Sequence, residues 1–237
     1  MKKITGAILT FLLIFTLFLI NSLAQQYIHT HTLTGHPYDV FSIVFIDNDT
    51  LISGSGDATI RVWDVNTGGQ RSIQDVTYAV FAVSTPAHDP TFVAYGGAWD
   101  TNIRMRYIES GKGRAKLQGH TATVRSLAFK PGSYHLASGS EDNTIRVWDV
   151  KDPNNPQHLH TLIGHTIDIW SVTWSPDGQF LASGSDNTTI RLWSLDNKVS
   201  FRELKGHQEG VWSVAFSPDG QMLASGSYEI LFVYGTC

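Results

Sequence analysis

The chain has 237 residues with 17 Lys and Arg against 21 Asp and Glu, a formal net charge of −4, and a single cysteine, Cys237. The mildly acidic charge excludes nucleic-acid binding through a basic surface, because phosphate binding needs clustered Lys and Arg. One cysteine excludes an intramolecular disulfide, so the fold must be held by its packed core.

Residues 1–24 have the pattern of an export signal. A start with two lysines precedes an apolar run over residues 4–20, and the small residues Ser22 and Ala24 occupy the minus-three and minus-one positions of a cleavage site. We therefore predict a cleaved signal peptide and an exported protein, periplasmic or secreted. The alternative is an uncleaved segment that anchors the chain to a membrane, although about 20 apolar residues are needed to span one.

The rest of the chain, residues 25–237, is built from a repeated phrase. A Gly-His pair opens the phrase at His36, His120, His165 and His207, and each copy runs on to a Ser-Gly-Ser. Successive histidines lie 84, 45 and 42 residues apart, so the period is a little over 40 residues. Such a period indicates one supersecondary unit copied along the chain, each copy burying its apolar face on the next. The predicted units cover residues 35–70, 71–115, 119–157, 164–200 and 206–237.

Within a unit, the apolar residues come in short bursts separated by turns. Residues 211–216 and 221–225 are predicted strands, joined by the tight turn Ser-Pro-Asp-Gly at 217–220, and residues 144–150 are a predicted third strand. No helical period is present, so we predict an all-β fold. Both faces of these strands are largely apolar, and radial packing of small sheets around an axis covers both.

The phrases Gly-His, Ser-Pro-Asp-Gly, Leu-Ala-Ser-Gly-Ser and Thr-Ile-Arg-x-Trp-Asp, in this order and at fixed offsets, resemble those of the WD-repeat family of β-propellers over about residues 28–229. The resemblance implies about five blades, each a four-stranded antiparallel sheet. It also implies a buried hydrogen-bonded network between the His, Ser, Asp and Trp of each repeat. Its members would be His36, Ser53, Asp57 and Trp63; His120, Ser138, Asp142 and Trp148; His165, Ser183 and Trp193; and His207 and Ser225.

Three units depart from this pattern. The second has Gln-Asp at 74–75 and Arg-Tyr at 106–107 in place of Gly-His and Trp-Asp, and the fourth has Asn187 at the acidic position. The last unit stops fitting the pattern after Ser227. Rings of this family more often hold seven blades. We therefore expect an open or imperfectly closed ring; the alternative is a closed five-bladed ring in which residues 27–33 supply the outer strand of the last blade.

Motifs that carry chemistry are few. The recurring His, Ser and Asp do not indicate a hydrolase triad, because a triad occurs once and its nucleophile is exposed. Two pairs, His29 with His31 and His158 with His160, have the spacing of metal ligands on a strand, but no Asp, Glu or Cys completes a ligand set. We therefore predict no metal, no cofactor and no enzyme activity.

A binding surface has better support. In the family that the chain resembles, partners dock around the central channel, on residues near the start of each inner strand and before the acidic turn position. Here these positions vary between units and are rich in aromatic residues, as interaction hot spots are. The alternative is that Trp170 and Trp212 only fill space between blades. The predicted partner-binding residues are Asp39, Phe41, Phe81, Trp99, Arg125, Glu141, Asp168, Trp170, Asp186, Trp212 and Tyr228, with Ala79, Thr123 and Gly210 at matching positions.

These patterns favour a non-enzymatic, exported propeller that serves as a platform for a protein or peptide. We expect no nucleic-acid partner, and membrane contact only through residues 4–20 if they are not cleaved. Two alternatives stay open. The chain is a truncated fragment of a longer WD-repeat protein without independent activity, or, less favoured, a propeller hydrolase or lyase that uses Glu141, Asp168 and Asp186 at the channel mouth.

Overall fold

The computed structural model describes residues 31–152, 154–195, 199–228 and 233–236. The described residues all belong to one compact unit, which begins at His31. The secondary structure of the described residues consists of β-strands alone. These strands form five antiparallel sheets, which we call blades one to five. The all-β prediction is therefore confirmed. The predicted signal peptide lies outside the described residues.

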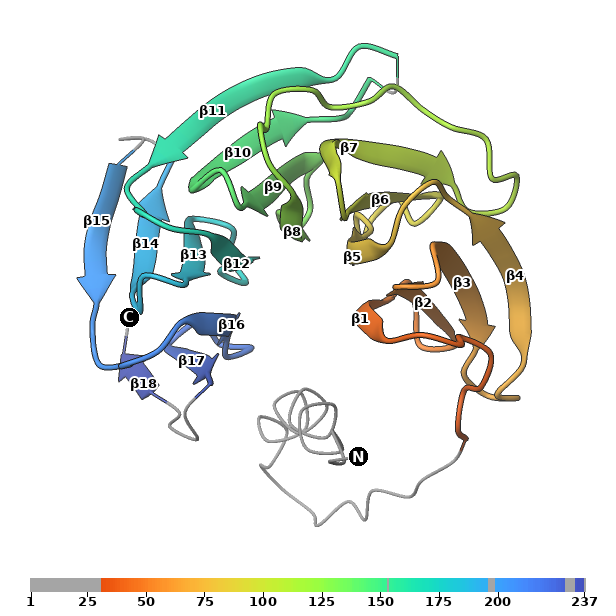
Figure 1. The fold of residues 1–237 in the computed structure, drawn as a ribbon, viewed down its shortest axis with the longest axis horizontal. Helices are drawn as coiled ribbons and strands as arrows, with labels where there is room; N and C mark the ends of the chain where they lie inside the picture. The colour runs from red at the N-terminus through yellow and green to blue at the C-terminus, as the bar shows by residue number, and fades with distance from the viewer. Residues whose placement is uncertain (1–30, 153, 196–198, 229–232, 237) are drawn as a thin grey trace. The chain divides into compact units, whose positions relative to one another are not determined.

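Each blade takes its strands in chain order, so every strand pairs with its neighbours in sequence (Figure 1). Blade one contains β1 (Val40–Phe45), β2 (Thr50–Ser55), β3 (Thr59–Asp64) and β4 (Gln70–Asp75), and blade two contains β5 (Val80–Ser84), β6 (Phe92–Gly97) and β7 (Asp100–Tyr107). Blade three contains β8 (Val124–Phe129), β9 (His135–Ser140), β10 (Thr144–Asp149) and β11 (Gln157–Ile163). Blade four contains β12 (Ile169–Trp174), β13 (Phe180–Ser185), β14 (Ile190–Ser194) and β15 (Val199–Leu204), and blade five contains β16 (Val211–Phe216), β17 (Met222–Ser227) and β18 (Val233–Thr236).

Blades two and five have three strands among the described residues, not the predicted four. In blade two, two isolated bridges, Ile103 with Leu117 and Arg106 with Gly113, take the place of a fourth strand. Glycines weaken a strand, and the segment that forms these bridges contains or follows two of them, Gly111 and Gly113. In the alternative of a closed ring, residues 27–33 would supply the outer strand of the last blade; residues 31–33 form no strand, and residues 27–30 lie outside the described ranges.

Neighbouring blades pack face to face through their inner strands, β1, β5, β8, β12 and β16, which line the centre of the arc in Figure 1. The side of an inner strand that faces the preceding blade begins with an aliphatic residue. A glycine on the second strand of the preceding blade makes room for it: a Cβ on Gly139 would lie only 2.7 Å from Ile169 Cγ2. The aliphatic residues are Val80, Val124, Ile169 and Val211, each at most 1% exposed.

A serine on the opposite side of the inner strand adds a polar link between blades. The backbone N–H of Val172 donates to Ser126 Oγ at 3.0 Å, and the N–H of Val214 donates to Ser171 Oγ at 3.1 Å. The N–H of Val83 donates to Ser42 Oγ in the same way. These bonds satisfy backbone donors that the sheet itself leaves free, and they fix the register of one blade on the next.

Strand β1 has the same aliphatic side without a blade to cover it. Val40, Ile43 and Phe45 are 46%, 49% and 54% exposed, whereas Val124 and Leu127 at equivalent positions of blade three are 0% and 8% exposed. Since the face that other blades bury stays open at β1, the described residues form an open arc. The prediction of an open ring is confirmed.

The predicted hydrogen-bonded network is present within blades one and three. In blade one, Trp63 Nε1 donates to Ser53 Oγ at 2.8 Å, Ser53 Oγ lies 2.7 Å from His36 Nε2, and His36 Nδ1 lies 2.8 Å from Asp57 Oδ2. An indole N–H can only donate, so the serine hydrogen goes to Nε2 and the Nδ1–H to the carboxylate. Blade three repeats this chain with Trp148, Ser138, His120 and Asp142.

Blade four keeps the network but replaces its carboxylate with an amide. His165 Nδ1 lies 3.2 Å from Asn187 Oδ1, and burial lowers the pKa of His165 to about 4. In blade three, burial acts to raise the pKa of Asp142, but hydrogen bonds from His120 and Thr144 outweigh it and hold that pKa well below its usual range. In blade five, His207 Nε2 lies 2.7 Å from Ser225 Oγ, and the acidic position lies outside the described residues.

The Asn187→Asp substitution should stabilise blade four. The pKa of His165 is lower in the folded protein than its ordinary value of 6.5, so protonation of this ring opposes folding. The free energy of unfolding of the present protein is therefore undiminished by His165 above pH 6.5 and falls as the pH drops towards 4. A carboxylate in place of the amide accepts a stronger hydrogen bond and favours the protonated ring. We expect a gain in the free energy of unfolding of about 1 kcal/mol at pH 7, and a larger gain at pH 5.

Urea denaturation of both proteins at the two pH values measures this gain. Gln221→Glu, which adds the same charge at an exposed turn, is the control and should change little. A gain that is no larger at pH 5 than at pH 7 would contradict the role assigned to His165.

Equivalent phenylalanines in blades one and three test the open arc. Phe129 packs on Phe92 of blade two with ring centroids 5.9 Å apart, so Phe129→Ala should cost about 3 kcal/mol of unfolding free energy. Phe45 has no such ring contact among the described residues and is exposed, so Phe45→Ala should cost less than about 1 kcal/mol. Denaturant unfolding measures both values. Equal costs would mean that the ring is closed in solution.

Candidate functional site

Two sets of loops meet on one face of the arc. One set leads into the inner strands, and the other joins the second and third strands of each blade. In blades three and four, the N–H groups of Glu141 and Asp186 in the second set donate to the carbonyl oxygens of Thr123 and Asp168 in the first, at 3.0 Å in each case. The same bond recurs in blades one and two. The repeat therefore places the predicted partner-binding positions side by side, blade after blade.

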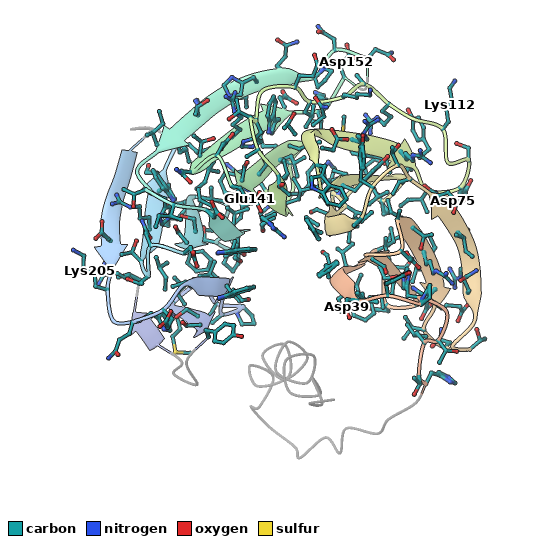
Figure 2. The ribbon with its side chains drawn as sticks, viewed as in Figure 1. Asp39, Asp75, Lys112, Glu141, Asp152 and Lys205 are labelled. Atoms are coloured by element: carbon teal, nitrogen blue, oxygen red, sulfur yellow. The ribbon has the colours of Figure 1, made fainter. Side chains whose placement is uncertain are left out.

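The labelled residues of Figure 2 show this arrangement. Asp39 and Glu141 lie at the inner ends of their blades, towards the centre of the arc. Asp75, Lys112, Asp152 and Lys205 lie on its outer edge. The predicted positions labelled there therefore lie near the inner strands and away from the outer strands.

The second residue of each inner strand takes part in a continuous series of ring contacts, which we call the aromatic ladder. Its members, in order around the arc, are the inner-strand residues Phe41, Phe81, Arg125, Trp170 and Trp212, followed by Tyr228, which comes directly after β17. Phe41 meets Phe81 edge to face, with centroids 4.9 Å apart, and Trp170 stacks on Trp212 at 4.6 Å with an interplanar angle of 12°. Tyr228 closes the series 6.0 Å from Trp212. Every blade thus contributes to one surface.

Arg125 forms the middle of the ladder. Its guanidinium carbon lies 4.3 Å from the ring centroid of Phe81 and 4.6 Å from that of Trp170, so the cation is held between two aromatic faces. Its Nε also donates to Glu141 at 2.7 Å. Cation–π contact and ion pairing together orient this side chain, which is half-buried.

Two carboxylates of blade four, Asp168 and Asp186, lie in these loops. Asp168 is half-buried, and burial, together with the charges of Glu141 and Asp186, raises its pKa. Asp186 lies against the backbone of blade five, because a Cβ on Gly210 would fall 2.2 Å from its Oδ1. Glycine is therefore needed at position 210 for Asp186 to lie there. Neither Asp168 nor Asp186 takes part in an ion pair among the described residues.

Trp170 differs from the tryptophans of the framework. Trp63, Trp148, Trp193 and Trp174 each donate their indole N–H to a serine hydroxyl or a backbone carbonyl. The Nε1 of Trp170 is buried, yet it has no acceptor among the described residues. An unsatisfied buried donor costs free energy.

Two predicted residues lie apart from the ladder. Trp99 is 86% exposed at a turn with φ of 55°, and no described ring contact joins it to the ladder. Asp39 is exposed, and its carbonyl accepts the loop bond from Gly56 at 2.9 Å. These positions add exposed groups to the face but no direct contact with the ladder.

Sequence reasoning missed three exposed residues on the same face. Tyr38, Tyr78 and Ile167 each stand directly before a predicted position, Asp39, Ala79 or Asp168. Their signal was a large aromatic or aliphatic residue at one loop position in three units, where the other two units have the small Ala122 and the charged Glu209. Exposed apolar groups that recur on one face enlarge the contact surface.

The family model described as "WD domain, G-beta repeat" matches residues 28–64, 111–149, 156–194 and 198–229, together more than half of the chain. It leaves residues 65–110 unmatched. That stretch contains all of blade two, where the Gly-His and Trp-Asp pairs are missing.

Three curated relatives illustrate the similarity. The chain is 33% identical over 125 residues to a ribosome biogenesis protein WDR12 homolog of Chlamydomonas reinhardtii, covering 50% of this chain and 28% of that protein. It is 31% identical over 152 residues to the nuclear distribution protein nudF of Emericella nidulans, covering 54% and 34%. It is 30% identical over 133 residues to a guanine nucleotide-binding protein subunit beta of Arabidopsis thaliana, covering 50% and 34%. The chain thus spans about a third of the length of these relatives.

The relatives correct one prediction. Ribosome biogenesis and nuclear distribution, which two of their names state, take place inside the cell, so the prediction of an exported protein is wrong. Its basis was a local pattern over residues 1–24, and the description of the structure begins at residue 31. Among the described residues, no helix is long and apolar enough to cross a membrane.

The repeated phrase, the open arc of antiparallel blades and the family model agree over most of the chain. The chain belongs to the WD40 repeat family.

Proposed function

We propose that the chain is a non-enzymatic platform that binds a protein or peptide on the face that carries the aromatic ladder. The observation behind this proposal is that five aromatic rings and one guanidinium form a continuous surface from blades one to five. Rigid aromatic side chains with an Arg supply much of the binding energy at protein interfaces. Trp212 and Tyr228 are 39% and 81% exposed, so a partner can reach them.

The relatives support this class of function. One of them is by name a subunit, which means that it works together with other polypeptides.

Photo-crosslinking from the face tests the proposal. Tyr228, replaced by p-benzoyl-phenylalanine, should crosslink a partner in lysate of the source cells, and the same group at Ile163 should not. Ile163 is a matched control because it is 75% exposed but lies on the outer strand β11. Equal crosslinking from both positions, or crosslinking from Ile163 alone, would place the binding surface elsewhere.

Truncation of one ring should weaken the same crosslink. Trp212→Ala removes the stacking partner of Trp170 and should lower the crosslinked yield at least tenfold, as loss of a hot-spot residue does. Because Trp212 is exposed, the melting temperature should change by only a few degrees, which circular dichroism measures. An unchanged yield would refute the assignment of Trp212.

A further inference from the structure

Neighbouring blades meet through two matching sides. The later blade contributes the first and fourth residues of its inner strand, which we call its aliphatic side because both are Val, Leu or Ile in blades two to five. The earlier blade contributes the third residue of its inner strand and a glycine of its second strand, which we call its glycine side. These two residues lie directly opposite each other in the sheet and therefore share a face, as Ser126 and Gly139 do in blade three.

The contact between blades three and four shows how the two sides fit. A Cβ on Gly139 would lie 2.7 Å from Ile169 and 2.9 Å from Val172, so the missing side chain leaves the space that both aliphatic residues fill. The N–H of Val172 also donates to Ser126 Oγ. Blades four and five repeat the arrangement, because Ser171 lies opposite a glycine and accepts a hydrogen bond from the N–H of the fourth residue of β16.

One side of each kind has no match among the described residues. The aliphatic side of blade one contains Val40 and Ile43, which are 46% and 49% exposed. The glycine side of blade five contains Ser213, which lies opposite Gly226. Gly226 is half-buried, whereas the equivalent glycines of the other four blades are buried. Since both sides are open in the same structure, the two ends of the arc do not cover each other.

No charge protects either open side. The inner strand of blade one, Val40–Phe45, has no charged residue, and neither do β16 and β17 of blade five. Repeat proteins normally need a polar outer face on their terminal units, and a single charged side chain on such a face is enough to oppose docking. Both ends of this arc therefore keep the chemistry of an internal blade contact.

We propose that a second copy of this chain supplies the match: the aliphatic side of blade one docks on the glycine side of blade five of the other copy. In this contact, Val40 and Ile43 lie over Gly226 of the second copy, and the N–H of Ile43 donates to its Ser213 Oγ. Four contacts within the chain serve as the template, since each joins the same two kinds of side. The contact does not use the ladder, so it goes beyond the proposed function and can fail independently of it.

The proposed contact joins two different surfaces, so it is heterologous. Each copy keeps one free side of each kind after the first contact, and association continues until a ring closes or chains of copies form. The contact covers one side of one blade, which is small for a protein interface, so we expect a Kd in the micromolar range. Dilute solutions then contain mainly single chains.

Sedimentation velocity on the whole chain tests the proposal. We expect the weight-average mass to be near that of one chain at about 1 μM and at least twice that at about 200 μM. Ile43→Asp puts a charge on the aliphatic side and Gly226→Glu fills the glycine side, so each variant should stay at single-chain mass at both concentrations. The control is Ile163→Asp, because Ile163 is 75% exposed on the outer strand β11, and it should associate as the original chain does. A single-chain mass at about 200 μM, or an equal loss of association in the control, overturns the proposal.

Mixing the two variants identifies which sides meet. Ile43→Asp keeps an intact glycine side and Gly226→Glu keeps an intact aliphatic side, so an equimolar mixture has one usable contact and should form dimers and nothing larger. A mixture that stays at single-chain mass contradicts the proposal, and so does association of Gly226→Glu alone, which would mean that two aliphatic sides meet. If Gly226→Glu lowers the melting temperature by more than a few degrees, Ser213→Glu blocks the same side and replaces it in the mixture.

Discussion

The contact between an aliphatic side chain and a glycine of the preceding blade sets the spacing of the whole arc. Ile169 packs where a Cβ on Gly139 would lie 2.7 Å from its Cγ2, and Val211 packs on Gly184 at the same separation. Because interiors are close-packed, this spacing allows little variation between blades. It brings the loop ends of successive blades within reach of one another. The ladder is a consequence, since stacking of Trp170 on Trp212 at 4.6 Å needs adjacent blades at one fixed separation.

The same constraint explains the exposed side of blade one. The repeat gives Val40 and Ile43 the aliphatic character that the interface requires, although no blade of the described residues precedes them. A repeat unit cannot bury its own apolar face, and it depends on a neighbour to do so. The relatives are about three times longer than the matched segment, so they have room for further elements of their own. Among the described residues, β1 therefore has apolar side chains that remain exposed.

Local patterns predicted most of the fold. The strand expected at 211–216 is β16, and the Ser-Pro-Asp-Gly turn after it leads into β17, because alternation and turn residues act within a few positions. The sequence did not predict that blade two has two isolated bridges in place of a fourth strand, because these bridges depend on pairing with β7 and not on a local pattern. The aromatic positions of the site were readable from the repeat, but their contacts were not. The meeting of Arg125 with Phe81 and Trp170 depends on three blades far apart in sequence.

A shift of register at the second residue of the inner strand separates the blade contact from the ladder. In β8 the pairing with β9 shifts between Val124 and Ser126, so the side chain of Val124 faces blade two, and that of the intervening residue, Arg125, joins the ladder. A change at the second position leaves the glycine contact of the first intact, so Phe81, Arg125 and Trp170 can occupy equivalent positions on nearly identical strands. The surface can therefore differ in charge and shape from blade to blade without altering the spacing of the blades.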